Sequence, residues 1–66
     1  MDPKEIFELI IKADEKLKYA TGANVEIRRG QARDLLNEAL AAAREAGNDA
    51  LVGQAEQRLK DLDAPP

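Results

Sequence analysis

The absence of both cysteine and histidine from this chain of 66 residues restricts how its fold can be stabilised. A domain of this length buries only about 60% of the surface that its unfolded chain exposes, and small domains are commonly reinforced by disulfides, metals or oligomerisation. Disulfides need cysteine, and structural metals are held mostly by cysteine and histidine. The sequence therefore predicts no metal site and no cofactor, and it leaves regular helix packing or oligomerisation as the source of stability.

The composition favours helices over strands. Hydrophobic residues make up 44% and charged residues 35% of the chain, which is typical of a folded domain. There are one Phe, one Tyr and no Trp, whereas aromatic and β-branched residues are enriched in strands. Ala and Leu, which have high helix propensity, are abundant. We therefore expect an all-α protein in which residues 1–66 form a single small domain.

The first helix is predicted over about residues 3–20. Asp2 can cap its amino terminus, and Pro3 suits the first helical position. Apolar residues then recur at alternating intervals of four and three, which places them on one face of a helix. Phe7 and Ile11 stand beside that face and widen it. The expected buried face consists of Ile6, Ile10, Ala13, Leu17 and Ala20.

The second helix is predicted over about residues 25–46. Gly22 is expected to end the first helix in a left-handed conformation, and Asn24 to cap the second. Gly30 is unusual inside a helix, where glycine costs about 0.5–1 kcal/mol relative to alanine. Either the regular helix begins near Gly30 or another backbone approaches it closely, and the sequence leaves both possibilities open. The expected buried face consists of Ala32, Leu36, Ala39, Ala43 and Ala46, with Leu35 and Leu40 beside it.

The third helix is predicted over about residues 49–62. Gly47 is a stop signal for the second helix, and Asn48 or Asp49 can cap the third. Residues 63–66 are expected to form a frayed tail. Three helices joined by short turns favour an up-down-up bundle. The expected buried face of the third helix consists of Leu51 or Val52, Ala55, Leu59 and Leu62.

Opposite charges four residues apart are expected to pair on the solvated faces of these helices, because such residues are neighbours on a helix surface. Each pair has the acidic residue on the amino-terminal side, which is the more favourable order. The pairs are Glu8 with Lys12, Asp14 with Lys18, and Glu56 with Lys60.

Residues 32–59 resemble the helical hairpin of a tetratricopeptide repeat. Ala32, Leu36 and Ala39 have the small, large, small spacing of the second helix of such a repeat. The segment Ala-Arg-Glu-Ala-Gly-Asn-Asp at 43–49 looks like the turn that leads into the next repeat, and Ala55 and Leu59 match packing positions of its first helix. The resemblance implies peptide or protein binding on a concave helical face, without catalytic activity. The chain is also similar in length and expected topology to microtubule-interacting and trafficking domains, which bind partner helices in a groove.

No apolar segment approaches the roughly 20 residues that span a bilayer. The first residues, Met1 to Glu5, lack the charged and then apolar pattern of a signal peptide. We therefore expect no membrane partner. The lack of cysteine is compatible with a reducing compartment, so the cytoplasm is the expected location.

Charge is unevenly distributed along the chain, whose formal net charge is −3. Basic residues outnumber acidic ones between positions 12 and 33, whereas both ends are acidic. The overall negative charge argues against nucleic acid as a partner, because such binding depends on basic surface. A nucleic-acid or phosphate-binding regulator is nevertheless the alternative function, although a solvated charged end is the simpler explanation for the same residues. The candidate anion-binding residues are Arg28, Arg29 and Arg33, with Lys12, Lys16 and Lys18 nearby.

The sequence offers no set of side chains suited to catalysis, and we expect that the chain is not an enzyme. Thr21 is the only hydroxyl residue besides tyrosine, and no histidine is present to activate it. Two pairs of carboxylates stand one helical turn apart, but such pairs occur by chance on most charged helices. These pairs are Glu5 with Glu8, and Asp34 with Glu38.

The main functional signal is a surplus of apolar residues. The segment Leu40-Ala41-Ala42-Ala43 is apolar on almost every side of the second helix, and Phe7 and Ile11 extend a stripe that is complete without them. A homodimer centred on the second helix, or a groove for a partner helix, would bury this surplus. Alanine also raises helix propensity on exposed faces, which is the simpler explanation for part of it. We therefore expect a protein-interaction module that associates with itself or another protein through Phe7, Ile11, Leu35, Leu40 and Leu51.

Overall fold

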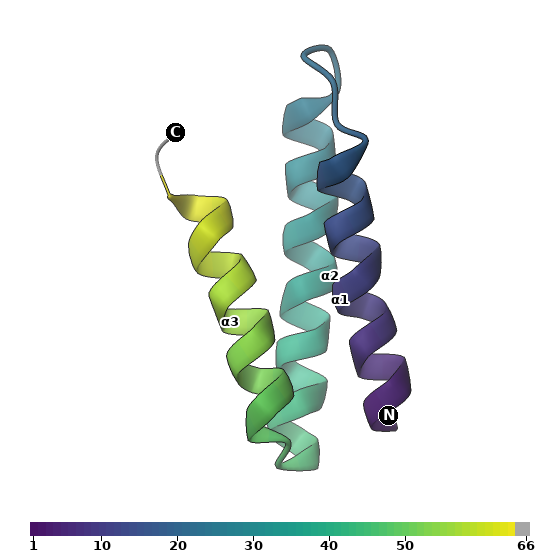
Figure 1. The fold of residues 1–66 in the computed structure, drawn as a ribbon, viewed down its shortest axis with the longest axis vertical. Coiled ribbons are helices and arrows are strands. Elements are labelled where there is room, and N and C mark those ends of the chain that lie inside the picture. The colour runs from purple at the N-terminus through teal and green to yellow at the C-terminus, as the bar shows by residue number, and fades with distance from the viewer. Residues whose placement is uncertain (65–66) are drawn as a thin grey trace.

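The computed structural model describes residues 1–64 and consists of three α-helices. Helix α1 spans Pro3–Lys18, α2 spans Val25–Ala46, and α3 spans Asp49–Asp63. The chain runs up α1, down α2 and up α3, so the predicted all-α three-helix bundle is confirmed (Figure 1). Helix α2 lies between the other two and packs extensively against both, whereas α1 and α3 touch each other over a much smaller area. The arrangement is flat, with Cα dimensions of 37 × 21 × 13 Å.

The core forms where the three predicted apolar faces meet, and most of it consists of small or aliphatic side chains. The largest side chains that are fully buried are Ile6, Ile10 and Leu36. Alanines on the facing stripes of all three helices let the helix axes approach closely. Leu17 and Leu59 are half-buried at the edge of this core, whereas Ala46 is exposed. The buried residues are Ile6, Ile10, Ala13, Ala32, Leu36, Ala39, Ala43, Leu51, Ala55 and Leu62.

Two helix starts are capped as the sequence predicts. An Asp2 carboxylate oxygen accepts a 2.8 Å hydrogen bond from the backbone N–H of Glu5. The Asn48 side chain accepts one of 3.1 Å from the backbone N–H of Leu51, at the start of α3. Between α2 and α3, Gly47 has a φ of 67°, which is the left-handed conformation expected at a helix carboxyl end. The sharp reversal between these two helices therefore follows from local sequence.

The turn between α1 and α2 differs from the prediction. Gly22 does not adopt a left-handed conformation, and α1 ends at Lys18 instead of continuing to residue 20. The side chain of Asn24 does not cap α2, because it accepts a 2.6 Å hydrogen bond from the backbone N–H of Thr21. The Asn24 side chain therefore stabilises the turn between the helices and does not accept a hydrogen bond from the first amides of α2.

Helix α2 is continuous through Gly30, so both explanations suggested for this glycine are wrong. The helix begins at Val25, well before Gly30. A Cβ atom built on Gly30 would have no heavy atom of another segment within 4 Å. The glycine is exposed on the outer side of α2, away from both neighbouring helices. The packing of α2 against α1 and α3 is sufficient to override its low helix propensity.

The ion pairs join different helices. Asp14 on α1 pairs with Arg58 on α3 at 2.9 Å, and Glu56 on α3 lies 3.4 Å from Arg44 on α2. The predicted pairs of Asp14 with Lys18 and of Glu56 with Lys60 do not form among the described residues, because an arginine of a neighbouring helix lies within reach. The predicted pair of Glu8 with Lys12 does not form there either.

The carboxyl end of α3 is more ordered than the predicted frayed tail. Asp63 is the last residue of α3, and its carboxylate pairs with Arg33 on α2. Arg29 donates a 2.6 Å hydrogen bond to the backbone carbonyl of Leu62. Residues 65 and 66, which complete the predicted tail, lie outside the described part of the chain.

Candidate interaction surface

The structure divides the five predicted partner-binding residues into exposed and packed groups. Phe7 and Ile11 on α1 are 42% and 36% exposed. Leu35 and Leu40 on α2 are half-buried and pack against the core, and Leu51 on α3 is only 7% exposed and belongs to it. Of the five, the two α1 residues are therefore the ones that the fold leaves most exposed to a partner.

A dimer centred on α2 does not fit this arrangement. Helix α2 is the middle helix, so its apolar flanks are covered by α1 on one side and by α3 on the other. Of the alanine-rich segment, Ala43 is fully buried and Leu40 and Ala42 pack against the core, which leaves only Ala41 exposed. The remaining outer face of α2 is mostly polar. Ile27 is 67% exposed there, and it stands alone beside exposed polar residues and Gly30.

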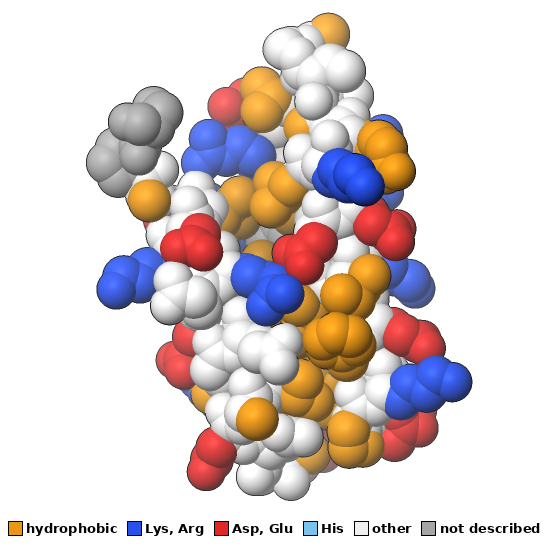
Figure 2. All heavy atoms as spheres, viewed as in Figure 1, with side chains coloured by type: hydrophobic (Ala, Val, Ile, Leu, Met, Phe, Trp, Pro, Cys, Tyr) orange, Lys and Arg blue, Asp and Glu red, His pale blue; other side chains and the backbone are white. Residues whose placement is uncertain are grey.

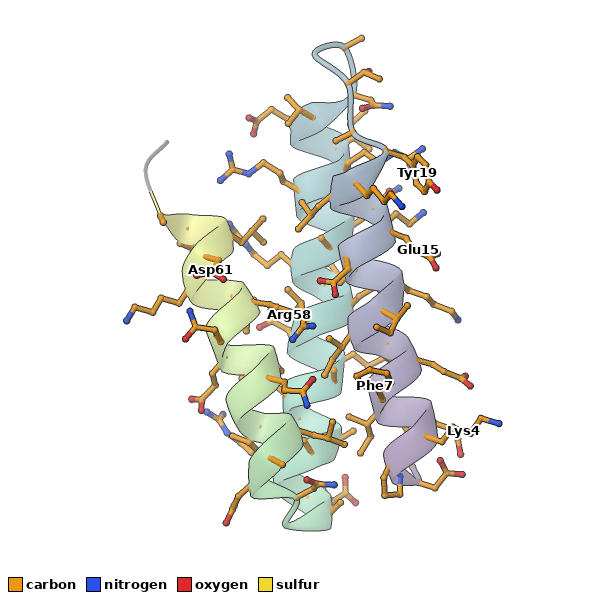
Figure 3. All side chains as sticks on the ribbon, viewed as in Figure 1. Lys4, Phe7, Glu15, Tyr19, Arg58 and Asp61 are labelled. Carbon is orange, nitrogen blue, oxygen red and sulfur yellow. The ribbon has the colours of Figure 1, made fainter. Side chains whose placement is uncertain are left out.

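Helix α1 carries a stripe of four exposed residues in which charged residues flank two apolar ones. Lys4, Phe7, Ile11 and Glu15 follow one another at intervals of three, four and four residues, so they lie along one side of the helix. We call these four residues the α1 stripe. Figure 2 shows hydrophobic side chains gathered along α1 and beside it toward α3. Figure 3 shows Lys4 near the first turn of α1, Glu15 near its carboxyl end, and Phe7 between them.

The charged members of the α1 stripe were missed in the sequence analysis. The apolar pattern drew attention to Phe7 and Ile11 alone. The same helical spacing, continued by one step on either side, reaches Lys4 and Glu15. The spacing of these four residues is therefore visible in the sequence. That they form an exposed surface is known only from the packing, which leaves this side of α1 uncovered.

The predicted basic cluster separates into two groups on opposite flanks of α2. Arg29 and Arg33 point toward α3, where they bind the Leu62 carbonyl and the Asp63 carboxylate. Arg28 lies on the flank that faces α1. Adjacent residues on a helix project about 100° apart, which is why neighbouring arginines reach different helices. The prediction that Arg28, Arg29 and Arg33 form one anion site is therefore corrected.

Arg28 lines a hollow of about 320 Å³ between α1 and α2. Lys12, Lys16 and Glu15 of α1 line it too, together with Tyr19 and Leu35. The predicted third lysine, Lys18, is placed elsewhere, with its ammonium group 5.5 Å from the centre of the Tyr19 ring. We call this the α1–α2 hollow.

A larger hollow of about 410 Å³ lies where the carboxyl end of α3 diverges from the other helices. Leu17, Val25 and Leu62 provide apolar walls. Its charged groups are already bonded within the fold: Asp14 to Arg58, Arg29 to the Leu62 carbonyl, and Asp61 to the Gln57 amide at 2.9 Å. The first two bonds link α3 to α1 and to α2 beside the hollow, whereas the Gln57–Asp61 bond lies within α3.

The paired carboxylates of α1 and α2 do not gather into a larger cluster. Among residues 1–64, no three acidic side chains lie close enough together to hold a metal ion. All four of Glu5, Glu8, Asp34 and Glu38 are exposed. No polar or charged side chain in this part of the chain is buried.

The helices of the described residues are too short or too polar to cross a membrane. Comparison of the chain with models of known protein families, with curated proteins and with solved structures finds no match. The resemblance of residues 32–59 to a tetratricopeptide hairpin therefore stays a prediction, and the surface of the molecule is the basis for any functional proposal.

Proposed function

We propose that this chain is a protein-interaction module that associates with a second copy of itself through the α1 stripe. The observation that carries the proposal is the exposure of Phe7 and Ile11, one helical turn apart, on a helix whose opposite side is fully packed. Single exposed apolar residues such as Ile27 are common on protein surfaces, whereas adjacent ones flanked by charges are typical of a contact surface.

The α1 stripe is complementary to itself when two copies run antiparallel. The midpoint between Lys4 and Glu15 lies within half a residue of the midpoint between Phe7 and Ile11, which is less than about 1 Å along a helix. A two-fold axis at this point sets Lys4 of each copy level with Glu15 of the other. The same axis brings Phe7 of each copy against Ile11 of the other. Such a self-complementary patch is what a two-fold symmetric dimer requires.

The proposed dimer is weak. One face of a single helix forms the contact, which is smaller than the roughly 1,200–2,000 Å² buried in stable complexes. Its exposed ion pairs would contribute at most about 1 kcal/mol each. We therefore expect association at high protein concentration and a monomer on dilution. The module would act by binding and without catalysis, and the lack of cysteine suits a cytoplasmic location.

Analytical ultracentrifugation over a wide range of protein concentration tests the proposal. The natural chain should increase in mass with concentration. Ile11→Gln weakens both symmetry-related Phe7–Ile11 contacts, and a combined loss of about 1.4 kcal/mol would shift the midpoint to higher concentration by roughly tenfold. Ile27→Gln is the matched control, because it removes the same kind of side chain from an exposed position on α2, outside the α1 stripe. A strict monomer at all concentrations, or equal effects of the two variants, would contradict the proposal.

Charge reversal tests the antiparallel arrangement. Lys4→Glu and Glu15→Lys each place like charges at both ends of the proposed contact, so each variant alone should associate less than the natural chain. Mixing the two variants restores opposite charges at both ends, and the mixture should associate again. In a parallel dimer Lys4 would already face Lys4, so single reversals that leave association unchanged would rule out the antiparallel contact.

A further inference from the structure

The cationic residues of the α1–α2 hollow differ from the other arginines of the described chain in lacking a bonding partner. Arg29, Arg33, Arg44 and Arg58 each bind an oxygen atom on another helix. Within residues 1–64, Arg28 takes part in no ion pair or side-chain hydrogen bond.

Lys12 and Lys16 share this property, and they face Arg28 across the hollow. They follow each other by four residues on α1, so their ammonium groups emerge on the same side of that helix. Lys16 and Arg28 are half-buried. Three positive charges thus share one concave surface with a single carboxylate, that of Glu15.

The electrostatic consequence is an attraction for anions. Like charges on the walls of a hollow repel one another, and partial burial reduces the screening of that repulsion by water. A bound anion would relieve it and would gain charge-assisted hydrogen bonds from the guanidinium and ammonium groups. The planar guanidinium of Arg28 can hold two oxygen atoms of one phosphate group, while each lysine acts as a point charge.

From these observations we infer that Lys12, Lys16 and Arg28 form a binding site for a small soluble ligand that carries a di- or triphosphate group. The volume of about 320 Å³ is at the lower end of the range of ligand sites, roughly 300–1,000 Å³. A long nucleic acid fits less well, because the chain has a net charge of −3 and Tyr19 is the only aromatic residue that lines the hollow.

Titration of the full chain with pyrophosphate at low ionic strength, followed by calorimetry or NMR, tests the inference. Pyrophosphate should bind with an affinity that falls as salt is added. Arg28→Gln should weaken binding by roughly tenfold or more, because charge-assisted hydrogen bonds are lost. Arg28 has no partner within the described structure, so this variant should keep the helical circular dichroism of the natural chain.

Two further variants separate a site from a general effect of charge. Arg44→Gln removes the same charge near the far end of α2 and should bind pyrophosphate nearly as well as the natural chain. Glu15→Gln removes the only carboxylate of the hollow and should strengthen binding. Equal losses in Arg28→Gln and Arg44→Gln would overturn the inference.

Two other probes test whether the phosphate group belongs to a small soluble ligand, a nucleic acid or a lipid. Single-stranded RNA and vesicles that contain a phosphoinositide should bind more weakly per phosphate group than pyrophosphate does. The inference would be overturned if either of them bound while pyrophosphate did not. None of these outcomes depends on self-association, because pyrophosphate binding can be measured at concentrations where the chain is monomeric.

Discussion

Gly30 and Gly47 are both glycines of the α2 segment, but they have different backbone conformations. The effect of replacing each one therefore depends on its φ angle. Gly47 has a positive φ of 67° and ends α2. Gly30 lies within the regular helix, where a side chain would meet open space. Glycine is needed at the first position because an L-residue is strained there, whereas at the second it only adds flexibility to the unfolded chain.

Opposite effects of alanine at these two glycines are the first prediction. Gly30→Ala should raise the free energy of unfolding by about 0.5–1 kcal/mol, because alanine favours the helix and no contact opposes it. Gly47→Ala should lower it by about 1–2 kcal/mol through the cost of the left-handed conformation. Urea denaturation of both variants measures these changes. A loss of stability in Gly30→Ala would mean that the outer face of α2 is covered in solution.

At the scale of the helix, the start of α1 depends on the charge state of Asp2. The backbone amide of Glu5 donates a hydrogen bond to the Asp2 carboxylate, and this bond lowers the pKa of Asp2 below its usual value. A carboxyl group with a lower pKa in the folded state stabilises the fold above the pKa that it has in the unfolded chain, which is about 3.9. That contribution is lost as the pH falls through the lowered pKa.

The pH dependence of α1 is the second prediction. On acidification below about pH 4, the natural chain should lose more stability than Asp2→Asn does. Asparagine is the matched control because it caps helices equally well but does not titrate in this range. Thermal unfolding of both proteins between neutral and acidic pH gives the comparison. Parallel curves for the two proteins would show that the Asp2 cap contributes no pH dependence.

At the scale of the whole molecule, α2 holds the bundle together because both other helices pack against it. It is the only described helix that packs along its length against two others, and Leu36 lies on it with no exposed surface. A domain of this size has only a few kcal/mol of net stability. Removing one central side chain should therefore affect all three helices together.

The loss of the Leu36 side chain is the third prediction. Leu36→Ala should cost about 2–5 kcal/mol, which is enough to unfold most of the population at room temperature. Leu40→Ala removes an equal side chain from a half-buried position of the same helix, and it should cost less and leave the protein folded. Circular dichroism at the helix minimum distinguishes the two variants. If Leu36→Ala kept as much helicity as Leu40→Ala and the natural chain, Leu36 would not be central to the core.

The fold class could be predicted from the sequence because each helix carries its own signals. The intervals of three and four between apolar residues identified the buried faces. The side chains of Asp2 and Asn48 accept hydrogen bonds from nearby backbone amides, and the backbone N–H of Gly47 donates to carbonyls of the preceding turn, so these residues mark helix ends. These interactions involve residues within one turn of each other, so they are encoded locally. The turn around Gly22 and Asn24 was harder to predict, because a side-chain hydrogen bond inside the turn competed with helix capping.

The candidate sites depended on tertiary packing. The sequence showed that the chain carries more apolar residues than one face per helix requires, and that its basic residues cluster between positions 12 and 33. Only the packing of α2 between α1 and α3 revealed that Leu35, Leu40 and Leu51 are covered, while Phe7 and Ile11 are not. The same packing divided the arginines, because ion pairs form with whichever helix lies within reach. Exposure and pairing are properties of neighbours that are distant in the sequence, and no local pattern specifies them.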